Sequence, residues 1–169
     1  MNPLSIRELF EYNYWAFDLI WQSISQLNDE QFTTDLNYSF GSIRNQVIHL
    51  ISSHRRWLDR LQMSELTPHL IFDDFSSLSS TRTEWDNARL EMLEYVYSLD
   101  QADLDELIHY QIKSRSIDTA HRRWEILLHL ANHSTDHRSQ ILSMLNTQFG
   151  IDTPEQDFII FLWSQNQNV

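Results

Sequence analysis

The amino-acid sequence predicts an all-α protein, a four-helix bundle with a long crossover between the second and third helices. Three observations lead to this fold class. The 169 residues include only two glycines and three prolines, too few for the turns of an all-β protein. Four segments place apolar residues at helical spacing. The length and the 41% of hydrophobic residues fit one globular domain over residues 1–169 with a single core.

The first two helices follow from apolar stripes that recur every three or four residues. The first stripe predicts a helix over roughly residues 5–27. The second helix begins after the segment SFGS, where Ser39 or Ser42 can cap its free amide groups. Its stripe continues to about Leu61, so this helix is long enough to span a bundle.

The third and fourth helices are predicted over roughly residues 81–99 and 120–147. Gly150 is a typical C-terminal stop for the fourth. Residues 62–80 form a connection long enough to cross the length of the bundle. The second and third helices are therefore expected to run parallel, as in bundles with a crossover connection.

Two shorter elements complete the predicted fold. Residues 106–118 alternate apolar and polar side chains, which indicates a small hairpin before the fourth helix. In the tail, Thr153 can act as a helix cap with Pro154 at the first helical position, which predicts a short final helix.

Composition excludes several classes of function. The net charge is −12, and Lys113 is the only lysine, so we expect no nucleic-acid partner because nonspecific affinity requires Lys and Arg. The absence of cysteine excludes disulfides and thiolate nucleophiles. The acidic start and the short apolar runs, the longest being residues 158–163, predict a cytoplasmic protein with no membrane partner.

A run of histidines, HLANHSTDHRSQIL, carries the main functional signal. On a helical wheel His133 and His137 fall at the border of the apolar arc, whereas His129 lies further toward solvent. Two imidazoles spaced i, i+4 can reach one metal ion, and a third ligand must come from another helix. The candidates are His49 and His54. Helical phase does not choose His49 and mildly favours His54 as the buried one.

Two segments together resemble the DinB/YfiT-like family. They are SFGSIRNQVIHLISSHRRWLDRL, residues 39–61, and the histidine run, residues 129–142, with its following Arg-x-Gln. The stretches IRELFEYNYWAFDLI and PEQDFIIFL are also similar to the family, so the likeness covers nearly the whole chain. The resemblance implies a four-helix bundle with a crossover, in agreement with the fold class expected from the residues.

The resemblance also implies a metal triad of His49, His133 and His137. His54 stands where relatives often have Glu, which makes it a neighbour of the site and a weaker ligand candidate. Asp136 stands where many members have a second histidine. Both are expected in the shell around the ligands, where hydrogen bonds tune metal affinity.

The function implied by this resemblance is that of a divalent-metal-dependent enzyme, with zinc or nickel as the expected ion. Characterised relatives include transferases and isomerases that use low-molecular-weight thiols. We therefore expect a thiol S-transferase or a hydrolase acting on a small molecule. The alternative is a non-catalytic metal-binding or structural bundle, and the sequence does not decide whether the protein is an enzyme. The family name refers to damage-inducible expression. The large apolar face of the bundle and the exposed, aromatic-rich first helix favour a homodimer.

Overall fold

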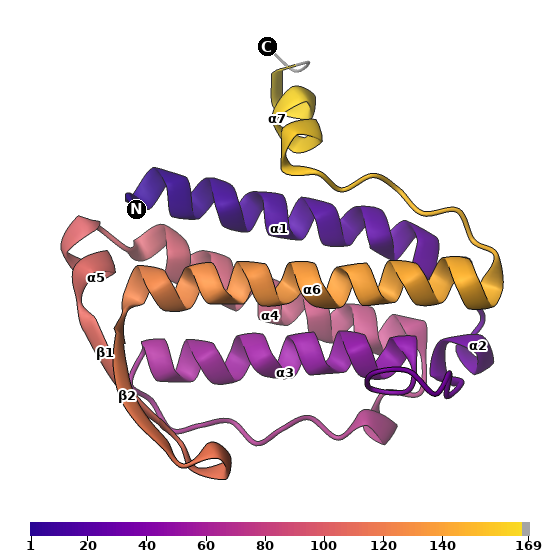
Figure 1. Cartoon of the computed structure of the whole chain (residues 1–169), viewed down its shortest axis with the longest axis horizontal. Helices are drawn as coiled ribbons and strands as arrows, with labels where there is room; N and C mark the ends of the chain where they lie inside the picture. Colours follow the sequence, from indigo (N-terminus) through magenta and orange to yellow (C-terminus); the bar gives the residue numbers. More distant parts are fainter. Residues whose placement is uncertain (167–169) are drawn as a thin grey trace.

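The computed structural model describes residues 1–166 (Figure 1). Within them the chain is mostly helical, with seven α-helices and one small two-stranded sheet. The predicted all-α class is therefore approximately right, and the sheet is the exception to it. None of the described helices is long and apolar enough to cross a membrane.

Four long helices lie side by side in Figure 1: α1 (Pro3–Ile24), α3 (Ile43–Leu61), α4 (Leu78–Ser98) and α6 (Arg123–Phe149). Helices α1 and α6 run in one direction, and α3 and α4 run in the opposite one. The connection from α3 to α4 contains the 3₁₀ turn η1 (Phe72–Asp74) and follows the helices over their length.

Local signals explain where these helices begin and end. Of the two serines expected as caps, Ser42 caps α3, because its hydroxyl accepts a hydrogen bond of 3.1 Å from the Asn45 amide. At the other end of the chain, Gly150 adopts a left-handed conformation with φ 63° and closes α6. Its amide donates to the Asn146 carbonyl at 3.0 Å.

The hairpin consists of β1 (Leu107–Ile112) and β2 (Ile117–Arg122), paired antiparallel with Leu107 opposite Arg122. It extends beyond residue 118, and the prediction that the fourth helix starts near residue 120 is wrong. Residues 120–122 pair with residues 107–109 of β1 in the antiparallel ladder, so α6 begins only at Arg123.

Two five-residue helices, α2 (Asp29–Thr33) and α5 (Gln101–Asp105), were not expected from apolar periodicity. Both begin with a capping box, in which the cap side chain and the third helical side chain exchange hydrogen bonds with each other's backbone. Each buries a single residue, Phe32 or Leu104, and a single buried position has no helical period.

The final helix, α7 (Phe158–Asn166), starts later than predicted, and the assignment of Thr153 and Pro154 to its first turn is wrong. The preceding segment is extended because its groups bind the neighbouring helices. The Gln156 carbonyl accepts from the Tyr12 hydroxyl at 2.8 Å, which ties this segment to α1.

The core runs between the four long helices. Trp85 of α4 stacks on Phe17 of α1, with ring centroids 3.6 Å apart, and both side chains are fully buried. His54 of α3 lies against Trp85 in this aromatic group, at 5.7 Å between centroids. The candidate histidines thus lie on α3 and α6, two helices whose positions are fixed by packing in the core.

Candidate metal centre

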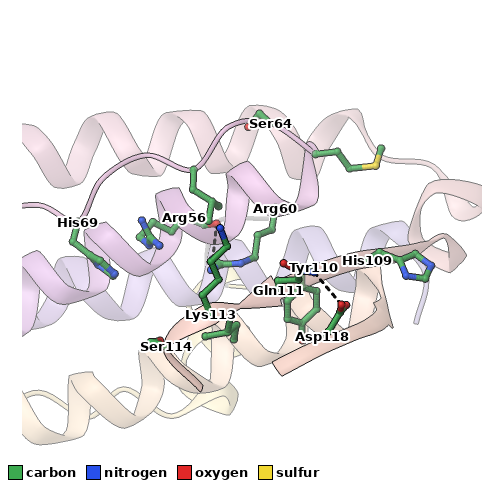
Figure 2. A pocket seen from close by; sticks show the side chains of 13 residues that line it. Arg56, Arg60, Ser64, His69, His109, Tyr110, Gln111, Lys113, Ser114 and Asp118 are labelled. Carbon is green, nitrogen blue, oxygen red and sulfur yellow. Dashed lines mark hydrogen bonds between the residues drawn. The ribbon is translucent and has the colours of Figure 1, made fainter. Parts of the chain in front are cut away.

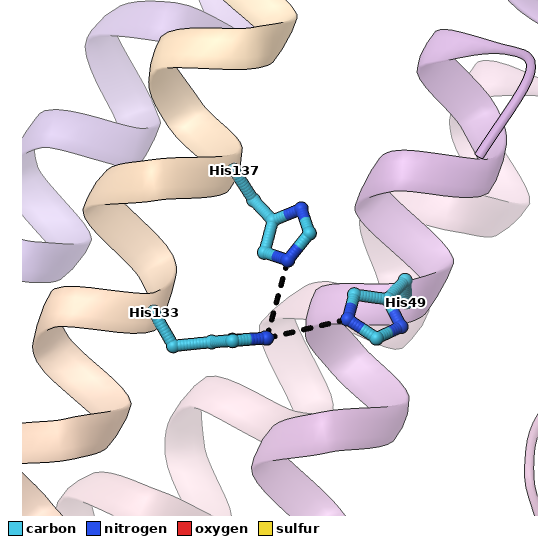
Figure 3. Close-up of side chains that lie close together, drawn as sticks. All are labelled: His49, His133 and His137. Carbon is cyan, nitrogen blue, oxygen red and sulfur yellow. Dashed lines mark hydrogen bonds between the residues drawn. The ribbon is translucent and has the colours of Figure 1, made fainter. Parts of the chain in front are cut away.

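His49, His133 and His137 converge between α3 and α6 (Figure 3). Nε2 of His133 lies 3.1 Å from Nε2 of His137 and 3.3 Å from Nε2 of His49. One ligand nitrogen from each ring lies within 4.8 Å of the other two. The i, i+4 spacing on α6 brings the first pair together, and the packing of α6 on α3 supplies the third ring.

The donor set fits a divalent metal ion. In a tetrahedral site with metal–nitrogen bonds of ~2.0–2.1 Å, two ligand nitrogens are about 3.3 Å apart. The Nε2–Nε2 distances from His133 to His137 and to His49, 3.1 and 3.3 Å, agree with that value. A single N–H of His133 cannot donate to both neighbouring rings, whereas one cation can accept a lone pair from all three.

A hydrogen bond sets the tautomer of His137. Its Nδ1 lies 2.7 Å from the side-chain oxygen of Gln46 on α3. An amide oxygen only accepts, so Nδ1 carries the hydrogen and the neutral ring keeps its Nε2 lone pair facing the other histidines. Gln46 is itself oriented by donating to Gln140 at 2.8 Å, and Gln140 donates to Asp136 at 3.3 Å.

The three rings are neutral at physiological pH. Burial, then the neighbouring His137 and His133, lowers the pKa of His49 to about 3. Burial, then His137 and His129, lowers the pKa of His133 to about 4, while Asp136 acts in the opposite direction. Burial also lowers the pKa of His137. Metal-binding imidazoles must be unprotonated, and these already are.

The site is covered on one side and accessible on the other. Phe40, in the loop before α3, stacks on His49 with ring centroids 4.1 Å apart and also lies beside His137. His133 lines a cavity of about 360 Å³ together with Ser53 and Trp57, and Phe40 is not part of its wall. A small molecule in this cavity can therefore approach the cluster from the side of His133.

The remaining sequence candidates lie around the cluster and not in it. His54 is 1% exposed, and its Nε2 lies 2.9 Å from the Ser134 hydroxyl. The helical phase therefore predicted that His54 is buried, but it did not predict which histidine of α3 lies beside His133. Asp136 is exposed, and it accepts a hydrogen bond from Gln140 and not from a ring of the cluster. His129 is exposed, one turn from His133.

Two residues near the site were missed from the sequence. Gln46 was visible only as a polar residue on the flank of α3, three positions before His49. Phe40 lies in the SFGS segment, which we interpreted as a cap and nothing more. Their contacts depend on how the loop and α6 dock on α3, and no local pattern encodes that docking.

Comparison with known proteins agrees with the resemblance of the histidine segments. The family model described as "DinB family" matches residues 1–169, the whole chain. The chain belongs to the DinB family. A curated relative, "Protein DinB" of Bacillus subtilis (strain 168), is 26% identical over 161 residues, which cover 92% of each chain. In this DinB-family protein the three-histidine group is compatible with a metal site.

Proposed function

We propose that this DinB-family protein is a divalent-metal-dependent enzyme in which His49, His133 and His137 are the metal ligands. Zinc or nickel is the expected ion, since imidazole suits both. The scaffold we propose is a single four-helix bundle domain formed by α1, α3, α4 and α6. The observation that carries the proposal is the convergence of three neutral Nε2 atoms beside a cavity.

Each residue has a distinct task in this proposal. His133 and His137 provide two ligand nitrogens from one helix face, and His49 provides the third from α3. Gln46 holds His137 in the tautomer that leaves Nε2 free. Phe40 keeps water from one side of His49. A divalent ion held by three imidazoles supplies a Lewis acid that lowers the pKa of a water or thiol bound beside it.

The reaction we propose is thiol S-transfer or hydrolysis of a small molecule in the cytoplasm. The chain contains no cysteine, so any thiol has to come from the substrate, such as a low-molecular-weight thiol. The alternative is a non-catalytic metal-binding or structural bundle. The cavity beside His133 supports a catalytic role instead, because a reacting molecule has a path to the site. A homodimer remains part of the proposal.

The test is elemental analysis of protein purified without chelator or affinity metal. We expect close to one metal ion per chain in the wild type, and loss of most of it in His49→Ala and His133→Ala. His129→Ala is the matched control, because His129 lies on the same helix one turn away and outside the cluster. Metal that is absent from the wild type, or retained in both cluster variants, would refute the proposed site.

A protein that holds metal is then assayed for thiol transfer and for hydrolysis. Turnover that disappears on metal removal and returns with the added ion supports the enzyme. Stoichiometric metal without turnover on either reaction class, in a protein whose stability depends on the metal, would instead favour the non-catalytic bundle.

A further inference from the structure

Two neighbouring cavities, which we call the groove, lie between the hairpin and the histidine cluster. Its outer part is a cavity of about 750 Å³ between the end of α3, the α3–α4 connection and the hairpin (Figure 2). Its inner part is the cavity of about 360 Å³ that His133 lines. The two cavities share Arg56, Arg60 and His69 in their walls. Each of the two cavities has the volume of a small-molecule site.

The groove collects positive charge in a strongly acidic chain. The net charge is −12, yet Arg56, Arg60, Lys113 and Arg115 all line it. Among the described residues none of these four has a carboxylate partner within 4.0 Å. Six other arginines do have one, and they are Arg44, Arg55, Arg82, Arg89, Arg122 and Arg123.

The two central guanidinium groups are oriented but largely unsatisfied. Nη1 of Arg56 donates to the Thr67 carbonyl, and Nη1 of Arg60 donates to the Arg56 carbonyl at 2.9 Å. Arg60 also lies over Trp57, 4.9 Å from the ring centroid. In the described part of the chain these are their only hydrogen bonds, which leaves most of the five donors of each group available.

The cations of the groove affect the pKa of a neighbouring histidine. Burial, then Arg56 and Arg60, lowers the pKa of His69, as expected beside two cations. Asp118 is the acidic residue in the wall of the outer cavity, and it accepts a hydrogen bond of 2.9 Å from Gln111. One carboxylate against four cations leaves the groove positive.

We propose that this groove binds a small organic anion through Arg56, Arg60 and Lys113, and that this anion is the substrate presented to the histidine cluster. The inference rests on the proposed metal-dependent function and adds the substrate class, a molecule with a carboxylate or phosphate group. Trp57 and Ile112 provide an apolar wall for its carbon skeleton. Because Arg56, Arg60 and His133 line the same inner cavity, a ligand of a few heavy atoms reaches both the cations and the cluster.

The test is calorimetric titration of the purified wild-type protein with succinate, with inorganic phosphate and with neutral succinamide. We expect saturable binding of succinate or phosphate, and none of succinamide. Binding of succinate alone identifies carboxylate as the recognised group, and binding of phosphate alone identifies phosphate. If neither anion binds, or if succinamide binds as well as succinate, the proposal is overturned.

Variants locate the binding in the groove. Arg56→Gln and Arg60→Gln should each weaken it tenfold or more, and Lys113→Gln, at an exposed position, threefold or more without a risk to folding. Arg44→Gln is the matched control on α3, since Arg44 pairs with Asp73 outside the groove. Equal affinity in all four variants would overturn the proposal.

Metal analysis of the same samples separates the two proposals. Anion binding that persists in His133→Ala after loss of metal supports the groove independently of the cluster. Metal at full occupancy without anion binding in the wild type overturns the groove and leaves the metal centre standing.

Discussion

His54 should make the metal-free protein sensitive to mild acid. The ring is 1% exposed, and it packs against Tyr14 and Trp85. Burial, then the nearby His133 and Arg138, lowers its pKa from 6.5 to about 3. The folded state therefore binds no proton at this position in a range where the unfolded chain does. Such a group stabilises the fold above pH 6.5 and loses that contribution as the pH falls toward 3.

The magnitude follows from the difference between the two pKa values. Each unit of pH below 6.5 lowers the free energy of unfolding by about 1.4 kcal/mol for this one residue. Between neutral pH and about pH 5 the loss is about 2 kcal/mol. Guanidinium denaturation of chelated protein at both pH values measures it. In His54→Gln, which cannot titrate, the difference between the two pH values should shrink by that amount.

The histidines of the cluster also have lowered pKa values, but they are present in both proteins, so comparison of wild type and variant isolates His54. His109→Gln, at an exposed position on β1, is the matched control. If wild type and His54→Gln lose stability in parallel between neutral pH and pH 5, the proposed burial of a neutral imidazole is wrong.

Two further changes test the support of the site. Gln46→Leu should weaken metal binding about 10–100-fold in a competition titration, because His137 loses the acceptor that fixes its tautomer, while the three ligands remain. Arg138→Met should lower the free energy of unfolding by about 1–3 kcal/mol in chemical denaturation. The fully buried guanidinium donates to Asn13, Thr135 and Gln156, and the variant leaves these acceptors unpaired; unchanged stability would contradict that role.

The four long helices could be predicted because each buries a stripe of several turns, and such a stripe has a period that the sequence displays. The short helices α2 and α5 could not, since each buries one residue. The boundary of α6 was misplaced for a related reason. Residues 120–122 suit either the start of a helix or the end of a strand, and pairing with β1 decides between them.

The candidate site was only partly predictable from the residues themselves. The helical wheel separated His133 and His137 from the exposed His129. All three residues lie on one helix, so their relative exposure depends on the period of that helix alone. It could not choose between His49 and His54, since phase reports the direction toward the core and the cluster lies at its border. The position of His49 opposite His133 depends on how α3 and α6 dock, and only the family resemblance carried that information.

The net charge of the chain does not describe the local charge of the groove. A value of −12 argues against polyanionic partners, which contact an extended surface. A small anion instead responds to the few charges within reach of one cavity. Six arginines are neutralised by carboxylates, whereas Arg56, Arg60 and Lys113 gather in a groove without such partners in the described structure. The hairpin brings the only lysine of the chain to the same groove as α3, so overall acidity and local selection of anions are compatible in one molecule.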